Sequence, residues 1–121
     1  MKKKPIVTFI LGTRPEAIKL APVILKFKAC LSIKTKIILT GQHKDMVKTV
    51  MDTFGLFEDL NLNLMTKTQS LTDITSKTLI GLEKEFKKNE IKLVIVQGDT
   101  STAFSAALSA FYHKIPIGHI E

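Results

Sequence analysis

Arg14 is the only arginine among the 18 basic residues of this 121-residue sequence, and its position makes it a candidate binding group. It follows an apolar run at residues 6–11 and stands where a helix is expected to begin. A helix N-terminus attracts anions through its N–H groups and dipole, and a guanidinium group matches phosphate oxygens. Arg14 is therefore either a phosphate or diphosphate contact or an exposed arginine beside a helix cap. For Lys19, five residues later, the local pattern indicates a solvated lysine.

Groups that could act as a general acid or base follow two other apolar runs. Asp99 comes after the run 91–96, where it is either catalytic or the N-cap of the next helix. His119 and Glu121 are two residues apart on an expected strand, so their side chains point to the same side. A carboxylate and an imidazole on one face could perform acid–base chemistry or could form a structural hydrogen bond.

The remaining polar candidates give weaker indications. Gln42 and His43 follow the run 36–39 and could cap or begin a helix, or contact a ligand. Three histidines and one cysteine show no metal-ligand spacing, so no metal site is expected. Cys30 has no histidine or base beside it and is expected to be a small buried residue rather than a nucleophile. A single cysteine also excludes an internal disulfide framework and fits a reducing compartment.

These candidates must be positioned by an alternating series of strands and helices. The expected strands cover residues 6–11, 36–39, 59–65, 91–96 and 115–120. The expected helices run from the turn 12–16 to about residue 30, over 46–54, from residue 70 to about 88 and over 100–113. This alternation predicts an α/β fold with a doubly wound, mostly parallel sheet and helices on both faces. Such sheets bind ligands beyond the carboxyl ends of their strands, where the candidates collect.

Two of the expected helices begin with recognisable caps. Thr13 and Glu16 have the spacing of a capping box, and Ser70 opens the third helix with Asp73 three residues on. The apolar stripe of that third helix predicts a buried face made of Leu71, Ile74, Thr78, Leu82 and Phe86.

Composition and charge exclude several classes of protein. Hydrophobic residues make up 45% and charged residues 24%, so a disordered chain is excluded. The net charge of +7 permits an anionic partner, but the lysines are scattered and not interleaved with aromatic residues, so no nucleic acid is expected. No apolar run approaches the ~18 residues of a membrane span, and no signal-peptide cleavage site follows the first run. We therefore expect a cytoplasmic protein with no membrane partner.

Five segments of the sequence resemble the bacterial non-hydrolysing UDP-N-acetylglucosamine 2-epimerases. They are residues 12–22 (GTRPEAIKLAP), 40–43 (TGQH), 97–100 (QGDT), 111–112 (FY) and 117–121 (IGHIE). They occur in the family's order and at its spacing over essentially the whole chain. The loop 12–16 matches neither the dinucleotide-binding fingerprint nor the P-loop, which disfavours a classical NAD site and a Walker-type NTPase.

The resemblance implies an isomerase that interconverts UDP-N-acetylglucosamine and UDP-N-acetylmannosamine for the synthesis of surface polysaccharides. It implies two Rossmann-like domains facing a cleft (the GT-B arrangement), elimination and re-addition of UDP, no nicotinamide cofactor, and a homodimeric full-length parent. Departure of UDP from C1 acidifies the C2–H bond, so a carboxylate base suffices while cations hold the leaving diphosphate.

The resemblance also implies roles for individual residues. Arg14 and Lys19 match positions that contact the substrate or its diphosphate, and Asp99 and Glu121 match acidic residues that bind substrate and take part in catalysis. Gln42, with His43 beside it, matches a contact to a second, regulatory UDP-sugar in some members. Asp45 and Thr68 stand where those members have glutamine and arginine, which argues against allosteric activation here.

Length is the largest departure from the family. Its enzymes are roughly three times longer, as two domains of ordinary size require. The resemblance therefore implies that residues 1–121 are an incomplete N-terminal Rossmann-like domain, without the C-terminal UDP-binding domain and inactive alone. Two alternatives stay open: a related GT-B enzyme acting on a differently acylated UDP-sugar, and a non-catalytic interaction module.

Overall fold

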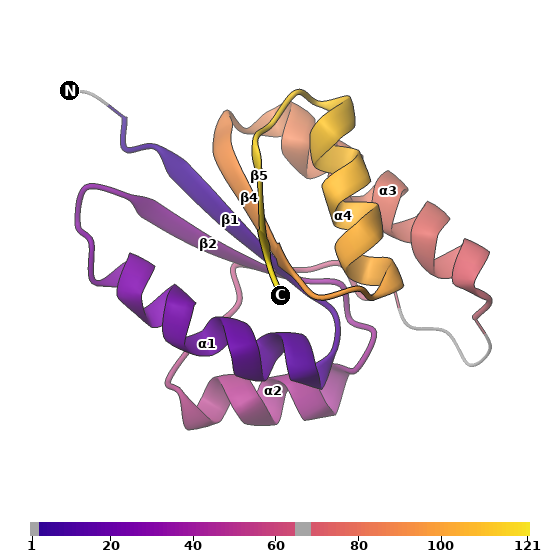
Figure 1. Ribbon diagram of the computed structural model, residues 1–121, viewed down its shortest axis with the longest axis horizontal. Helices are drawn as coiled ribbons and strands as arrows, with labels where there is room; N and C mark the ends of the chain where they lie inside the picture. Colours follow the sequence, from indigo (N-terminus) through magenta and orange to yellow (C-terminus); the bar gives the residue numbers. More distant parts are fainter. Residues whose placement is uncertain (1–2, 65–68) are drawn as a thin grey trace.

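The computed structural model describes residues 3–64 and 69–121 of the chain, apart from the side chain of Lys44. Strands and helices alternate along these residues (Figure 1). The elements are β1 (Ile6–Leu11), α1 (Arg14–Lys28), β2 (Lys34–Leu39), α2 (Lys44–Thr53), β3 (Leu60–Asn61), α3 (Leu71–Lys88), β4 (Ile91–Gln97), α4 (Ser101–Tyr112) and β5 (Ile117–Ile120).

The five strands form one sheet in the order β3-β2-β1-β4-β5, and every neighbouring pair is parallel. The chain builds outward from β1 to β2 and β3, then crosses back to β4 on the other side of β1 and continues to β5. This reversal makes the carboxyl ends of β1 and β4 a topological switch point, where open α/β sheets bind their ligands. The predicted doubly wound α/β fold is confirmed.

The helices cover both faces of the sheet, with α1 and α2 on one side and α3 and α4 on the other (Figure 1). Successive residues of β1 supply the two cores alternately, because strand side chains point to opposite faces. Phe9 and Leu11 pack with α1 and α2, whereas Ile10 packs with α3 and α4. All three side chains are essentially inaccessible to solvent, which fixes the register of the central strand.

The third strand is shorter than its alternating sequence predicts. β3 contains two residues, although the Leu62 and Leu64 N–H groups still donate to backbone carbonyls at the end of β2. Asn63, two residues after the end of β3, has a φ of 52°, which turns the chain out of the extended conformation. The final residue of the predicted strand, Met65, lies outside the described residues.

The third helix begins as predicted but buries less of its first turn. Ser70 and Asp73 form the expected capping box. Leu71, however, is 72% exposed, so its prediction as a core residue is wrong. The first turns of α3 extend beyond the sheet (Figure 1), and complete burial on this helix begins only at Thr78.

Cys30 is exposed, which corrects the prediction of a buried cysteine. α1 ends at Lys28, so Cys30 falls in the turn that follows the helix rather than on its inner face. The hydroxyl of Ser32 lies 3.2 Å from the Cys30 sulfur, and this contact lowers the pKa of the thiol.

Candidate functional site

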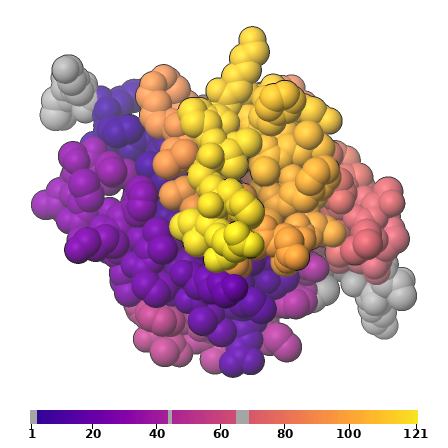
Figure 2. Space-filling view, in the orientation of Figure 1, coloured from indigo at the N-terminus to yellow at the C-terminus, as the bar shows by residue number. Residues whose placement is uncertain are grey.

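Loops from several strands meet at the carboxyl edge of the sheet, as the sequence predicts. The loop after β2 joins the loop after β1, because the His43 N–H donates to the Gly12 carbonyl at 3.1 Å. The loop after β4 joins the end of β5, because the Gly98 N–H donates to the Ile120 carbonyl at 2.8 Å. In the space-filling view, the yellow C-terminal strand lies at the surface and borders the orange residues of α4 (Figure 2). These bonds join the loops in two pairs along the carboxyl edge of the sheet. We call this edge, which carries the candidate residues, the rim.

A buried carboxylate, Glu16, lies at the centre of this rim. Its side chain is 1% exposed, and its two oxygens accept hydrogen bonds from two different loops. The Gly12 N–H donates to one oxygen at 3.2 Å. The hydroxyls of Thr13 and Thr100 donate to the other, the latter at 3.2 Å.

This arrangement corrects the capping box that the spacing of Thr13 and Glu16 predicts. Thr13 does occupy the N-cap position of α1, but its hydroxyl caps no helix N–H group and donates to Glu16 instead. The Glu16 carboxylate accepts from the N–H of Gly12, the residue before the N-cap. The residue thus connects two loops instead of closing a local cap.

Burial raises the pKa of the Glu16 carboxyl above its ordinary value, even though its three hydrogen bonds all favour the charged form. All three partners are uncharged donors, and none of the ion pairs found in the described part of the chain involves Glu16. The sequence contains a pattern that indicates this burial. Glu16, Leu20 and Ile24 follow one another at four-residue intervals and therefore lie on the same, buried face of α1.

The first turn of α4 forms the opposite wall of the switch point. Thr100, not Asp99, is the N-cap of this helix, because its hydroxyl accepts from the Ala103 N–H at 3.0 Å. This excludes the capping alternative for Asp99, whose side chain is exposed at the tip of the loop. The Thr102 hydroxyl donates to the side-chain carbonyl of Gln42 at 2.6 Å, which ties the second loop to the same helix turn.

Gly12 makes this close approach possible. A Cβ atom on Gly12 would lie 2.5 Å from the Thr102 hydroxyl oxygen and 2.9 Å from the Thr102 Cβ atom. Because Thr102 is β-branched and buried, its side chain has little room to move aside. The glycine that opens the first signature segment is therefore required by packing between β1 and α4.

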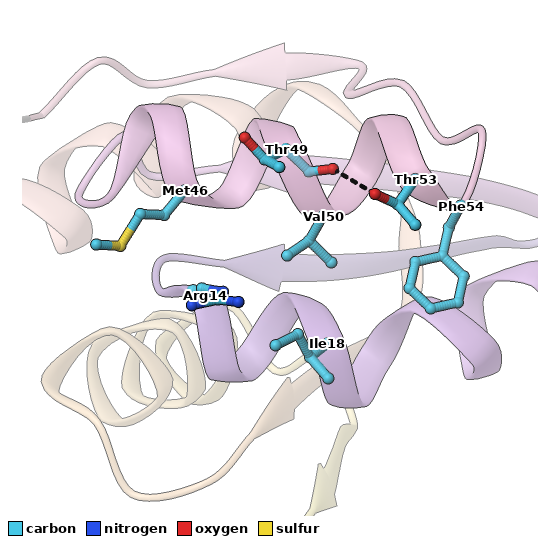
Figure 3. Close-up of a pocket in the computed structure, with 7 residues that line it drawn as sticks. All are labelled: Arg14, Ile18, Met46, Thr49, Val50, Thr53 and Phe54. Atoms are coloured by element: carbon cyan, nitrogen blue, oxygen red, sulfur yellow. Dashed lines mark hydrogen bonds between the residues drawn. The ribbon is translucent and has the colours of Figure 1, made fainter.

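Arg14 and Lys19 are both exposed, as their predicted roles require. Arg14 is the first residue of α1 and stands at one end of a groove of about 330 Å³ between α1 and α2 (Figure 3). Apolar side chains of Ile18, Met46 and Val50 form much of its lining. Neither Arg14 nor Lys19 makes an ion pair or hydrogen bond within residues 3–64 and 69–121, so both cations are available to a ligand.

Asp99 lines a second hollow, of about 380 Å³, together with Thr100 and His119. The His119 ring nitrogen Nε2 hydrogen-bonds the Gly98 carbonyl at 2.7 Å. The pairing of His119 with Glu121, one of the sequence alternatives, is absent from the hydrogen bonds of the described residues. Glu121 is exposed immediately after β5. The structure thus places Asp99 and His119 together, and places Arg14 in a different hollow.

Gln42 and His43 lie in the turn before α2, and His43 is its N-cap residue. The His43 side chain makes no cap hydrogen bond, and its Nδ1 atom is buried without a partner in the described residues. Asp45 is exposed in the first turn of α2, whereas Thr68 lies outside the described residues.

No group of three or more metal-ligating side chains occurs in residues 3–64 and 69–121. In that same part of the chain, no helix is long and apolar enough to cross a membrane.

A doubly wound parallel sheet with helices on both faces defines a Rossmann-like α/β domain, and cationic and acidic side chains surround its switch point. The profile of the family described as UDP-N-acetylglucosamine 2-epimerase matches residues 26–121. The chain belongs to this family.

Individual relatives agree with this assignment. The UDP-N-acetylglucosamine 2-epimerase of Bacillus subtilis is 44% identical over 121 residues, which are 100% of this chain and 32% of the relative. The crystal structure of the Neisseria meningitidis enzyme bound to UDP-GlcNAc matches with a TM-score of 0.92 and 44% identity, over 96% of this chain and 31% of that one. The Methanocaldococcus jannaschii enzyme in complex with UDP-GlcNAc and UDP matches with a TM-score of 0.89 and 37% identity, over 96% and 32%. The chain spans about a third of these relatives' length and corresponds to their N-terminal part.

Proposed function

We propose that residues 1–121 form the N-terminal part of an enzyme that interconverts UDP-N-acetylglucosamine and UDP-N-acetylmannosamine. The observation that carries this proposal is the junction at the switch point, where the loop bearing Arg14 is bonded through Glu16 to the loop bearing Asp99. Family membership supports the reaction, and the UDP-GlcNAc bound in the Neisseria structure supports the substrate. The product would serve the synthesis of surface polysaccharides in the cytoplasm, where an exposed thiol such as Cys30 stays reduced.

The reaction requires two bonds to break. The C1–O bond breaks with its electron pair leaving on UDP, and the C2–H bond loses its proton to a carboxylate. A double bond then joins C1 and C2 in a glycal. Return of a proton to the opposite face of C2, with attack of UDP on C1, gives the epimer, so no electrons are gained or lost.

The exposed residues of the rim are suited to these steps. Asp99 and Glu121 would transfer the C2 proton, since a carboxylate can act as base in one direction and as acid in the other. Arg14 and Lys19 would hold the departing diphosphate, whose negative charge grows as the C1–O bond breaks. The N–H groups at the start of α1 add to this field, because Arg14 is the first residue of the helix.

Gln42 would supply a further ligand contact. Its carbonyl oxygen is occupied by Thr102, and its amide NH₂ group has no hydrogen bond in the described residues, so that group is available to a ligand. We propose Gln42 and His43 as contacts for a second UDP-sugar, without the allosteric activation that Asp45 and Thr68 argue against.

The experiment uses a chimera in which residues 1–121 replace the matching segment of the Bacillus subtilis relative. We expect the chimera to convert UDP-N-acetylglucosamine to UDP-N-acetylmannosamine, followed by proton NMR of the sugar. The 121-residue chain alone is expected to be inactive, since it spans about a third of the relatives it matches. A folded chimera without turnover would contradict the proposed function, and turnover by the chain alone would contradict the need for the remaining two thirds.

A further inference from the structure

We propose that Glu16 is a positioning residue that holds the loop bearing Arg14 in place against the loop bearing Asp99. This inference rests on the proposed function, because it assigns Glu16 a part in placing the groups of that site. Glu16 itself is buried and is not expected to touch the substrate.

The two hydroxyl donors of Glu16, Thr13 and Thr100, lie directly beside candidate site residues in the chain. Thr13 precedes Arg14, and Thr100 follows Asp99. Both hydroxyls donate to the same oxygen of the Glu16 carboxylate. A shift of this carboxylate therefore moves the backbone of both functional residues, which lie on opposite sides of the switch point.

The chemistry of a carboxylate fits this junction better than that of an apolar residue. An ionised carboxylate is an acceptor only, so it can receive all three donors that surround it. Burial of a charge without an ion pair is costly, and an apolar side chain at this position would avoid that cost. A residue that only filled space in α1 would not need three donors drawn from two loops.

A second set of contacts makes the junction rigid. Thr102, in the first turn of α4, lies against Gly12 and donates to Gln42. The first turn of α4 thus contacts the loops after both β1 and β2. Without the Glu16 bonds, the loop after β1 would still pack through Gly12 against Thr102, but its hydrogen bond to the loop after β4 would be lost.

The test compares Glu16→Ala and Glu16→Gln in the chimera. Glutamine can accept from the Gly12 N–H and donate its NH₂ group to the two threonine hydroxyls, so we expect kcat/KM within about threefold of the parent. Alanine removes every bond, and we expect kcat/KM to fall by about 10- to 100-fold, since small misplacements of reacting groups have effects of that order. Rates are taken per folded enzyme, well below each variant's melting temperature.

Two further variants keep the test decisive. Ser109→Ala removes another buried hydroxyl of α4, one without a partner in the described residues, and should leave kcat/KM unchanged. Thr13→Val removes one donor and no helix-cap bond, so it should lower kcat/KM even if Glu16→Ala fails to fold. If Glu16→Ala and Thr13→Val lower only the melting temperature, with kcat and KM unchanged, the positioning role is overturned.

An independent measurement separates this inference from the proposed function. In the 121-residue chain, Glu16→Ala should shift the backbone amide NMR signals of residues 98–101, while Ser109→Ala should not. An inactive parent chimera would contradict the proposed function alone. Unchanged signals at 98–101 would overturn the positioning role whatever the chimera does.

Discussion

The Thr100 hydroxyl donates a hydrogen bond of 3.2 Å to the buried carboxylate of Glu16, a residue 84 positions earlier in the chain. This bond crosses the switch point, because Glu16 belongs to the helix after β1 and Thr100 to the turn after β4. It connects the two halves of the rim on which Arg14 and Asp99 are displayed.

The first prediction concerns pH and stability. Burial raises the pKa of Glu16, so the folded chain holds this proton at pH values where the unfolded chain has lost it. The stabilising contribution of Glu16 is therefore complete below its ordinary pKa of about 4.5 and is lost as pH rises through the folded value. Urea titrations give the unfolding free energy of the parent and of Glu16→Gln. The value for the parent minus that for the variant should fall as pH rises from about 4.5 through the folded-state pKa of Glu16.

Glu90 supplies the control for this measurement. Its carboxylate is exposed and bonded to Lys92 at 2.9 Å, and that bond lowers the pKa of Glu90. The Glu90→Gln variant should therefore give a slope of the opposite sign. A parent-minus-Glu16→Gln difference that rises with pH would contradict the raised pKa of Glu16.

The second prediction concerns Gly12. The Gly12→Ala variant forces a Cβ atom against Thr102, and overpacking of this kind costs about 1–3 kcal/mol of unfolding free energy. Gly118→Ala is the matched control, because its Cβ would meet Ile95 at an ordinary 3.4 Å. Removal of the Thr102 hydroxyl and methyl by Thr102→Ala should recover part of the loss. Additive effects of Gly12→Ala and Thr102→Ala would show that the two residues do not clash.

The third prediction concerns the single arginine. In the chimera, Arg14→Ala should raise the KM for UDP-N-acetylglucosamine by about tenfold, the equivalent of roughly 1.4 kcal/mol of binding. Arg14→Lys should be intermediate, because it keeps the charge and loses the bidentate geometry. Stability should not change, since the side chain is exposed. Lys26→Ala, which removes another exposed cation of α1, should have no effect on KM. Equal effects from the two alanine variants would remove Arg14 from the substrate site.

Much of this architecture could be predicted from local sequence patterns. Apolar runs and helical stripes predict the parallel sheet, and the position of Arg14 after the first strand places it at the carboxyl edge. These patterns succeed because strand and helix periodicities are local properties of the chain.

The errors have physical causes that act over longer distances. The spacing of Thr13 and Glu16 fits a local cap, and only the arrival of Thr100 from another strand makes the carboxylate an interior link. Leu71 follows the helical stripe, yet its turn of α3 extends past the sheet that would cover it. Packing between distant elements, which no short pattern contains, decided each of these cases.

The proposed function depends most directly on Asp99 as a proton-transfer group at the switch point. The decisive measurement is turnover of the chimera in deuterated water, with incorporation of deuterium at C2 of the UDP-sugar followed by NMR. Asp99→Asn should lower turnover and C2 exchange together by about 10²- to 10⁴-fold, the usual contribution of a general acid or base. Because Asp99 is exposed and caps no helix, the unfolding free energy should stay unchanged. Turnover and exchange within about twofold of the parent would contradict the account.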